Sequence, residues 1–534
     1  MNIAGHLPRV AAERPEAVAV ACPDGRGGFA ERTFRQLDER SDAVARGLHR
    51  VGVRPGERAA VLVRPGHDFF ALTFALFKAG VVPVLIDPGI GVRNFGRCLD
   101  EAAPSLFFGI RSAVIARKLL GWGRSTIRRV IAVGPRGVNT LEGLAAIGRE
   151  GAPTLHVPSV NETAAILFTS GSTGPPKGAI YTHEIFNAQV ESLRSTYGIE
   201  PGEVDLCTFP LFALFAPALG MTAVVPEMDA TRPGRADPRK IVGAIRGRGV
   251  TTMFGSPALV RRVADYGCEH NIKLSNLRRV ISAGAPVPAS VVERFASLLA
   301  PGARVHTPYG ATEALPVATI GSDLILGSTR AETERGRGVC VGRPVEGMRV
   351  QVIRVEDGPI GAWDDSLVLA DGEVGELAVR GPVVTRGYIR RPEADALSKI
   401  IDPRDGATWH RMGDLGRRDG TGLLWFYGRK SHRVVTPSAT LYTIAVEAVF
   451  NRVVGVARTA LVGIDSRPIL CVERSYKGPG DRSILRDLTE IGAMHEHTKE
   501  IHTFLFHRGF PVDIRHNAKI RRESLAIWAA RKLR

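Results

Sequence analysis

Apolar residues follow two different rhythms in the first part of the chain. They recur every three or four positions over residues 33–52 and 67–80, which is the spacing of helices with a buried face. Between and after these segments lie two short apolar runs, "RAAVLV" at 58–63 and "VVPVLID" at 81–87, which are typical of buried strands. Strands that alternate with helices of roughly 10–15 residues predict crossover connections and a parallel sheet.

The alternation continues along much of the sequence and then changes. It returns at "AAILFT", "GVTTMFGSP" and "LRRVISAGAP", whereas residues 350–424 form short strand-like runs separated by turn residues. A block with its own helical and strand patterns follows Gly428 and is long enough for a small independent domain. We therefore predict an α/β protein with a large domain over residues 1–428, including a β-rich part, and a small α+β domain over residues 429–534. The polar stretch "GRKSHR" is a candidate hinge, and a surface loop is the alternative.

The composition is that of a globular protein with an excess of positive charge. The chain of 534 residues has 71 Lys and Arg against 54 Asp and Glu, a net charge of +17. Such an excess favours anionic ligands or an acidic partner, although an Arg-rich solvated surface also accounts for it. No basic stripe interleaved with aromatic residues occurs, so the pattern argues against nucleic-acid binding.

Cysteine spacing and apolar segments favour a cytoplasmic protein. The six Cys lie far apart without a C-x-x-C pair, which argues against structural zinc and for a reducing compartment. The N-terminal segment has no apolar core of signal-peptide length. The most apolar segment, "FFALTFALFKAGVVPVLI", is interrupted by Lys78 and Pro83 and is shorter than the ~20 apolar residues that span a membrane. We expect no transmembrane segment.

The stretch "LFTSGSTGPPKGAIYTH" at 167–183 is the first candidate for ligand binding. It follows an apolar strand and combines glycines, hydroxyl side chains and a lysine, so N–H groups, hydroxyls and one positive charge can surround a polyphosphate. It departs from the common nucleotide-binding loop, because Pro176 precedes Lys177 and Gly178 follows it. A flexible Gly/Ser linker is the alternative, which the preceding strand disfavours. The candidate phosphate ligands are Thr169, Ser170, Gly171, Ser172, Thr173, Gly174 and Lys177.

Further motifs follow in order along the chain. "SAGAPVP" at 282–288 follows another strand, "YGATEA" contains Thr312 and Glu313, "HRMGDLG" contains Asp414, "GRK" contains Arg429, and "DIRHNAKI" contains Lys519. Each residue alone has an ordinary structural alternative, such as a turn, a helix start or a surface charge. Together and in this order, the motifs resemble those of the adenylate-forming superfamily, which includes acyl-CoA synthetases, luciferases and peptide-synthetase adenylation domains. The resemblance covers nearly the whole chain.

The resemblance implies a role for each motif in joining an organic acid to ATP. Residues 169–177 are expected to hold the β- and γ-phosphates, and Asp414 with Arg429 to hold the ribose. Thr312 is expected at the α-phosphate, and Glu313 at Mg²⁺. Lys519, on a mobile C-terminal domain, is expected to neutralise the approaching anions. A carboxylate that attacks a phosphate needs a cation and a metal, because two anions meet. The expected adenine-side residues are Gly284, Ala285, Pro286, Tyr309 and Gly310.

A narrower resemblance concerns the acceptor of the activated acid. "TFPLFALFAPALG", "VVPEMDATRPGRADP", "FGSPAL", "TPYGATEALPVA" and "FPVDIRHNAKIRRESLAIWA" resemble the β-lactone synthetases of bacterial long-chain olefin pathways. That resemblance implies a 2-alkyl-3-hydroxyalkanoic acid, whose own hydroxyl closes the lactone. It also implies neighbouring enzymes, among them an α/β-hydrolase-fold decarboxylase, with which the protein is expected to assemble. Thioester formation is disfavoured because the residues at the positions that usually serve CoA ligation differ: Ala213, Ser431, Ser438 and Ala518.

An apolar pocket for the acid is expected beside the "YGATEALPVA" motif. Its candidate walls are Phe212, Leu214, Phe215 and Leu219, with Leu315 and Val317 after a helix that starts in "YGATE". Ordinary core packing is the alternative for each of them.

The group that takes the hydroxyl proton is left open. The candidates are His183, His306, His410 and His516, of which His183 stands at a helix start and is better explained as structural. The departing phosphate is a further acceptor. Two other functions are also left open: an acyl-CoA or acyl-AMP ligase, and a non-catalytic acyl-nucleotide binding protein.

Overall fold

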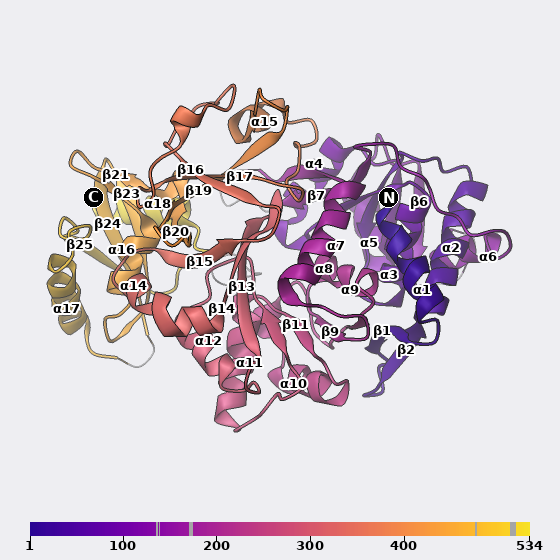
Figure 1. Cartoon of the computed structure of the whole chain (residues 1–534), viewed down its shortest axis with the longest axis horizontal. Helices are drawn as coiled ribbons and strands as arrows, with labels where there is room; N and C mark the ends of the chain where they lie inside the picture. The colour runs from indigo at the N-terminus through magenta and orange to yellow at the C-terminus, as the bar shows by residue number, and fades with distance from the viewer. Residues whose placement is uncertain (135–136, 138, 170–174, 476–477, 513–518) are drawn as a thin grey trace.

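The computed structural model describes residues 1–134, 137, 139–169, 175–475, 478–512 and 519–534. Within these ranges the strands form a six-stranded sheet near the N-terminus, a fourteen-stranded sheet, and two small sheets in the C-terminal part. Figure 1 shows the N-terminal elements at one side, the C-terminal elements at the other, and β13 and β14 between them.

The six-stranded sheet runs in the order β6-β5-β3-β4-β7-β8 and is parallel except for β8. Its strands are β3 (Arg58–Leu62), β4 (Val82–Ile86), β5 (Leu106–Ile110), β6 (Arg129–Val133), β7 (Thr163–Thr169) and β8 (Lys177–Thr182). The helices of this region are α1 (His6–Glu13), α2 (Phe34–Arg50), α3 (His67–Lys78), α4 (Val92–Ala102), α5 (Arg111–Leu120), α6 (Leu141–Ile147) and α7 (His183–Tyr197).

Local chemistry explains where the first helices begin and how they pack. Thr33 and Gln36 form a reciprocal capping box at the start of α2, which satisfies two backbone donors. Helix α3 is buried along almost its whole length. Its last residue, Lys78, is 1% exposed and forms ion pairs of 2.6 Å with Asp38 and 2.7 Å with Asp42, so the buried charge is compensated by two carboxylates of α2.

The large sheet follows the order β16-β17-β19-β20-β15-β14-β13-β12-β11-β9-β10-β1-β2, with β18 attached to β19. Strands β1, β10, β9, β11, β12 and β13 are parallel to one another, whereas β2 pairs antiparallel with β1 and the sheet becomes antiparallel from the β13–β14 hairpin onward. The strands are β1 (Val18–Pro23), β2 (Phe29–Thr33), β9 (Val204–Cys207), β10 (Thr222–Val224), β11 (Thr252–Phe254), β12 (Arg279–Ile281), β13 (Arg304–Ala311), β14 (Ala314–Gly321), β15 (Val339–Pro344), β16 (Arg349–Ile353), β17 (Gly375–Arg380), β18 (Lys399–Ile401), β19 (Thr408–Arg418) and β20 (Leu424–Arg429). The helices of this region are α8 (Pro210–Ala213), α9 (Phe215–Ala218), α10 (Pro238–Gly247), α11 (Pro257–Glu269), α12 (Ala289–Ala296), α13 (Ser322–Leu324), α14 (Arg330–Glu334) and α15 (Pro392–Ser398).

The C-terminal part has its own small sheets and core. Its elements are β21 (Val434–Val435), β22 (Thr440–Leu441), α16 (Thr443–Phe450), β23 (Val456–Ile464), β24 (Arg467–Arg474), α17 (Asp481–Ala493), β25 (Thr503–His507) and α18 (Arg522–Lys532). Arg522 Nη2 reaches both carboxylate oxygens of the buried Glu447, at 2.6 and 2.7 Å, and thereby joins the start of α18 to α16. His432 and Glu523 form a second contact of 3.2 Å between the junction and α18.

The structure confirms the predicted α/β class and corrects one element. The helix expected to start in "YGATE" is wrong, because the chain continues as β13, turns at Thr312–Glu313 and returns as antiparallel β14. Pairing with β12 on one side and β15 on the other fixes both strands. The six cysteines all lie within the described ranges and none is in a disulfide. Over those ranges, no helix combines the length and apolarity that a membrane span requires.

Candidate active site

A deep cleft lies where the carboxyl ends of several parallel strands meet the C-terminal segment. Its volume is about 2360 Å³, and it is lined by the ends of β3, β4, β11 and β13 and by the loop after β12. Ligands of open α/β sheets commonly bind at this end of the strands. Lys519 and Arg522 line the same cleft from the C-terminal side. Most of the predicted site residues that the structure describes lie along this cleft.

One end of the cleft contains a paired carboxylate. Asp414, on β19, is 5% exposed. Its Oδ2 accepts a hydrogen bond of 2.8 Å from the Tyr309 hydroxyl, and its Oδ1 accepts one of 2.7 Å from Arg429 Nη1. Burial and the Asp414 charge raise the pKa of Tyr309 well above its ordinary value, and Asp414 also raises the pKa of Arg429. Both partners therefore remain protonated donors, and the carboxylate keeps further acceptor positions for a ligand.

Glu313 lies at the turn between β13 and β14 and is held by residues from other elements. Its Oε1 accepts a hydrogen bond of 2.6 Å from the Tyr388 hydroxyl. Lys177 Nζ and Lys399 Nζ lie 5.1 and 5.9 Å from the centre of the Tyr388 ring. Burial lowers the pKa of Lys399 to about 8, while the charges of Glu313 and Asp395 oppose that shift. Two cationic side chains thus flank the tyrosine that orients the Glu313 carboxylate.

The backbone around Thr312 is fixed at several points. The Tyr181 hydroxyl donates a hydrogen bond to the Thr312 carbonyl oxygen, and the Thr385 N–H donates one of 2.8 Å to the Glu313 carbonyl oxygen. Gly310 precedes this turn, and a Cβ there would lie 2.5 Å from the Ala314 carbonyl oxygen. A side chain at position 310 would therefore force the hairpin apart.

The loop after β12 forms another wall of the cleft. Gly284, Ala285 and Pro286 all line it, as predicted for this motif, and Gly284 has a φ of 98°, in the region that favours glycine. Ser282 begins the loop and is 1% exposed. Its Oγ lies at the cleft without a hydrogen-bond partner among the described residues.

The opposite end of the cleft is apolar. The Phe212 and Phe254 rings stack with centroids 4.4 Å apart, and Phe215 lies 6.4 Å from Phe212. A smaller cavity of about 60 Å³ is lined by Phe212, Phe215 and Leu315, all of which also line the large cleft. Further residues of the small cavity include Asp205, Tyr197, Leu219, Met221 and Ile281.

The expectations for the apolar wall hold for all residues but one. Phe212, Leu214, Phe215 and Leu315 line the cleft, and Leu219 lines the small cavity. Val317 does not, because it is fully buried in the core that β14 shares with β16 and β17. Its predicted place in the pocket is wrong, since the pocket prediction assumed a helix where β14 is a strand.

The phosphate loop is described only at its ends. Residues 170–174, which include the predicted Ser170, Gly171, Ser172, Thr173 and Gly174, lie outside the described residues. Thr169 pairs with Lys177 across the β7–β8 hairpin. Lys177 does not line the cleft; its Nζ lies over the ring of Tyr388, whose hydroxyl contacts Glu313.

Three of the four candidate histidines are described by the structure, and none of the three lies at the cleft. Burial lowers the pKa of His183 and of His306 to about 4 and that of His410 well below its ordinary value. His183 Nδ1 accepts a hydrogen bond of 3.2 Å from the Ile3 N–H, which agrees with the structural role expected for it. None of these three lines the cleft. His516 and Ala518 lie outside the described residues.

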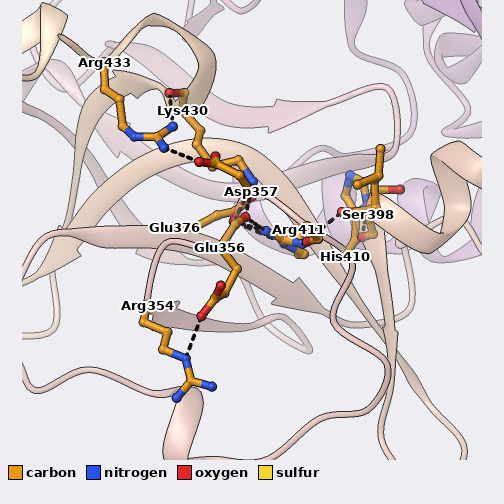
Figure 2. Close-up of polar contacts among 11 residues, drawn as sticks. Arg354, Glu356, Asp357, Glu376, Ser398, His410, Arg411, Lys430 and Arg433 are labelled. Carbon is orange, nitrogen blue, oxygen red and sulfur yellow. Dashed lines mark hydrogen bonds and ion pairs between the residues drawn. The ribbon is translucent and has the colours of Figure 1, made fainter. Parts of the chain in front are cut away.

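Charged side chains tie the predicted hinge to the large domain, as Figure 2 shows. Lys430 Nζ lies 3.0 Å from Glu376 Oε2, which also accepts a bond of 2.7 Å from Arg411 Nη2. Arg433 Nη2 donates a bond of 2.7 Å to Asp357 on the adjacent loop. Glu376 and Arg411 are almost fully buried, so this end of the junction is anchored. Motion about the junction remains a prediction.

Four residues near the site were missed from sequence alone: Tyr181, Gln189, Tyr388 and Lys399. Tyr388 and Lys399 belong to a β-rich stretch without a recognisable motif, and only three-dimensional pairing brings them to Glu313. Gln189 had a usable signal, because it follows the buried Ile185 by four positions and so occupies the buried face of α7.

The comparisons with known proteins agree with this geometry. The chain is 50% identical over 549 residues to an olefin beta-lactone synthetase of Xanthomonas campestris, covering 99% of this chain and 98% of that protein. Its fold is similar to that of ATP-bound MatB from Rhodopseudomonas palustris, with a TM-score of 0.82, 21% identity and full coverage of both chains. It is also similar to the O-succinylbenzoate coenzyme A synthetase of Bacillus subtilis in complex with ATP and magnesium ion, with a TM-score of 0.76, 21% identity and coverage of 97% of this chain and 98% of that one.

A family-level match covers most of the chain and includes much of the cleft. Residues 7–389 match the AMP-binding enzyme family, and this span contains the β7–β8 hairpin, the loop after β12, Tyr309, Glu313 and Tyr388. Together with the identity to the synthetase above, this match shows that the chain belongs to the AMP-binding enzyme family.

Proposed function

We propose that the protein is an ATP-dependent β-lactone synthetase acting on a long-chain 2-alkyl-3-hydroxyalkanoic acid. The observation that carries the proposal is the continuity of the cleft, which runs from the Asp414–Arg429 pair to the apolar wall around Phe212 and Phe215. A nucleotide and a chain-bearing acid can therefore lie end to end, with their reacting groups near Thr312. The 50% identity to an olefin beta-lactone synthetase supports the choice of reaction.

The first step joins the acid to the nucleotide. A carboxylate oxygen attacks the α-phosphorus of ATP, a new P–O bond forms, and the bond to pyrophosphate breaks. Asp414 accepts hydrogen bonds from the ribose hydroxyls, and residues 284–286 and Tyr309 line the adenine. Lys519 places a positive charge where the two anions meet, and this charge stabilises the transition state. Thr312 binds the α-phosphate oxygens, and the loop 169–177 binds the phosphates that leave.

The site fits one Mg²⁺ ion held mainly by phosphate oxygens. Glu313 offers a carboxylate at the cleft, one oxygen of which is oriented by Tyr388. Among the described residues no cluster of three or more Asp, Glu, His or Cys forms a self-sufficient metal cage. Mg²⁺ commonly binds through one or two carboxylates and substrate phosphates, so a single Glu matches it. When bound, the ion offsets phosphate charge during the transfer.

The second step needs no further substrate. The 3-hydroxyl oxygen attacks the acyl carbon, a C–O bond forms, and the bond between that carbon and the AMP oxygen breaks. The hydroxyl proton passes to the departing phosphate, and the products are the lactone and AMP. Tethering the nucleophile to the electrophile gives effective molarities of ~10⁵ M or more. The apolar end of the cleft excludes water that would hydrolyse the adenylate.

Residues 429–534 act in this proposal as a mobile domain that carries Lys519. Lys519 lines the cleft in the described arrangement, and the Arg522–Glu447 pair holds its segment against α16. The anchored Lys430–Glu376 contact marks the fixed side of the hinge. Assembly with an α/β-hydrolase-fold decarboxylase and the other olefin-pathway enzymes belongs to the same proposal, since a strained β-lactone is a reactive product that a later enzyme can convert.

The test is incubation of the protein with ATP, Mg²⁺ and a long-chain 2-alkyl-3-hydroxy acid in the absence of CoA. The expected product is lighter than the acid by one water, and AMP and pyrophosphate appear with it in equal amounts. A strict requirement for CoA, with a thioester as product, would point to an acyl-CoA ligase. Absence of AMP with every acid tested would point to a binding protein.

A further inference from the structure

Gln189 carries a buried amide oxygen that the protein itself does not satisfy. The residue lies on α7 and is 4% exposed. Its Nε2 donates a hydrogen bond of 2.9 Å to the Leu315 carbonyl oxygen. Since only the nitrogen of an amide can donate, this bond fixes which way the amide points. Among the described residues, no group donates to its Oε1.

A buried acceptor without a hydrogen-bond donor destabilises the protein, so this oxygen is a candidate contact for a ligand. Leaving such a group without a partner costs the free energy of removing it from water, with no hydrogen bond to offset that cost. The position lies on the buried face of α7, one turn after Ile185, where an apolar residue would pack without that cost. A ligand that donates a hydrogen bond at this point would remove the penalty on binding.

The position of Gln189 indicates which part of a ligand it meets. Gln189 lines both the large cleft and the small apolar cavity, together with Phe212, Phe215 and Leu315. Its hydrogen bond to the Leu315 carbonyl places it two residues from Glu313 along the β13–β14 hairpin. It therefore lies where the apolar end begins, beside the place proposed for the reacting carboxyl group.

We propose that Gln189 Oε1 accepts a hydrogen bond from the 3-hydroxyl of the substrate, and that this contact selects 3-hydroxy acids over acids that lack the hydroxyl. The inference rests on the proposed function. Near the carboxyl group, the hydroxyl is the one donor of such an acid, because the carboxylate is ionised and the chains are apolar. Gln189 is a substrate-positioning residue: when the hydroxyl hydrogen points to Oε1, the oxygen lone pairs are free to face the acyl carbon.

The test compares two acids that differ only in the hydroxyl. Wild-type protein and Gln189→Met are assayed by ATP–pyrophosphate exchange with a 2-alkyl-3-hydroxy acid and with the matching 2-alkyl acid. We expect kcat/KM for the hydroxy acid to fall by roughly 10–100-fold in the variant, the effect of one lost hydrogen bond to a buried group. The exchange rate with the deoxy acid is expected to change less than threefold, about the size of an ordinary context effect.

The deoxy acid separates recognition from structural damage. Gln189→Met also removes the bond to the Leu315 carbonyl, and that loss would affect both acids equally. Gln351→Met is the matched control, since Gln351 on β16 likewise has an Oε1 without a partner among the described residues but does not line the cleft. This control variant should leave the ratio of kcat/KM for the hydroxy acid to that for the deoxy acid unchanged. If Gln189→Met does not fold, Gln189→Asn withdraws the oxygen by one methylene and serves in its place.

One result overturns the inference alone: an unchanged ratio of kcat/KM for the two acids in the Gln189 variant, whether it keeps its activity or loses it equally with both. Failure of the proposed function is a different outcome, because the wild-type protein itself would then yield no lactone and no AMP from the hydroxy acid.

Discussion

Two buried aspartates, Asp414 at the cleft and Asp205 at the small apolar cavity, differ in the groups that surround them. Asp414 is 5% exposed and has an arginine and a tyrosine as donors. Asp205, at the small apolar cavity, is 9% exposed, and its Oδ2 accepts a hydrogen bond of 3.2 Å from the Cys207 thiol. Burial raises the pKa of Asp205 to about 7, although the nearby Arg279 opposes the shift.

The difference is what the proposed function requires of a site that serves two chemically unlike substrates. At the proposed nucleotide end, the Asp414 carboxylate is paired with Arg429 and can accept further hydrogen bonds from hydroxyl groups. At the small apolar cavity, Asp205 has the Cys207 thiol as its hydrogen-bond donor, and burial raises its pKa to about 7, so its uncharged form persists to a higher pH than that of an ordinary aspartate. Changes at the two ends should therefore affect different measured quantities.

The largest effect is expected from Lys519→Ala at the nucleotide end. Removing the positive charge from the meeting point of two anions should lower kcat for pyrophosphate release by about 10²–10³-fold. The melting temperature of the variant is measured alongside, so that a loss of fold is distinguished from the loss of a positive charge at the cleft. Lys532→Ala, at the exposed end of α18, is the control and should retain full activity. Undiminished pyrophosphate release by Lys519→Ala would contradict the role proposed for it.

A pH-dependent change in stability is expected from Asp205→Asn. In the unfolded chain the pKa of Asp205 is near the ordinary 3.8, and in the folded protein it is about 7. The unfolded chain therefore binds fewer protons between these values, and the contribution of Asp205 to stability is lost as the pH rises from about 4 to about 7. Over this pH range the free energy of unfolding should fall by on the order of 3 kcal/mol because of Asp205. Asparagine is neutral at every pH, so the Asp205→Asn variant should lack this part of the dependence of unfolding free energy on pH.

The measurement for Asp205 is a series of urea unfolding midpoints at pH 4.5 and pH 7.5 for both proteins. The variant should gain stability relative to wild type only at the higher pH. Equal differences at the two pH values would mean that Asp205 is ionised in the folded protein as freely as in the unfolded chain.

Asp414→Asn should weaken ATP binding without changing the preference among acids. Loss of the charged acceptor is worth about 1.5–3 kcal/mol, which corresponds to roughly a 10–100-fold increase in KM for ATP. Steady-state kinetics with ATP and with two acids of different chain length measure both quantities. A shift in chain-length preference would show that the two ends are not independent.

The smallest effect is expected from Met221→Phe at the apolar end. Met221 is 1% exposed and lines the small cavity, so a larger side chain should shorten the longest chain that is accepted. We expect roughly a tenfold loss in kcat/KM for the longest acids and none for short ones. KM for ATP should stay the same. A uniform loss for all acids would mean that the cavity does not hold the chain.

Sequence reasoning predicted the elements whose structure depends on neighbouring residues. It failed for elements whose structure depends on pairing between distant segments. Helix α2 (Phe34–Arg50) lies within the predicted 33–52, because Thr33 caps it and its apolar spacing is regular. The residues after Tyr309 were expected to form a helix, but strand pairing on both sides makes them a hairpin. Tyr388 could not be predicted at the site, because its contact to Glu313 joins segments 75 residues apart.

Motifs predicted the nucleotide end better than the acid end for a related reason. The residues proposed to hold the nucleotide lie in short ordered motifs, and the structure brings Asp414, Arg429 and Tyr309 into contact. The acid end is made of apolar residues that look like any core. The helical spacing could have placed Gln189 on a buried face, but only the structure shows that its amide oxygen has no partner among the described residues.

The most direct test of the account follows the oxygen atoms of the acid. A 2-alkyl-3-hydroxy acid labelled with ¹⁸O at both carboxylate oxygens is converted with ATP, and the lactone and AMP are analysed by mass spectrometry. Adenylation of the carboxylate followed by attack of the 3-hydroxyl predicts one label in AMP and one in the lactone carbonyl. Both labels in the lactone, with none in AMP, would show that the hydroxyl rather than the carboxylate is activated, and would contradict the account.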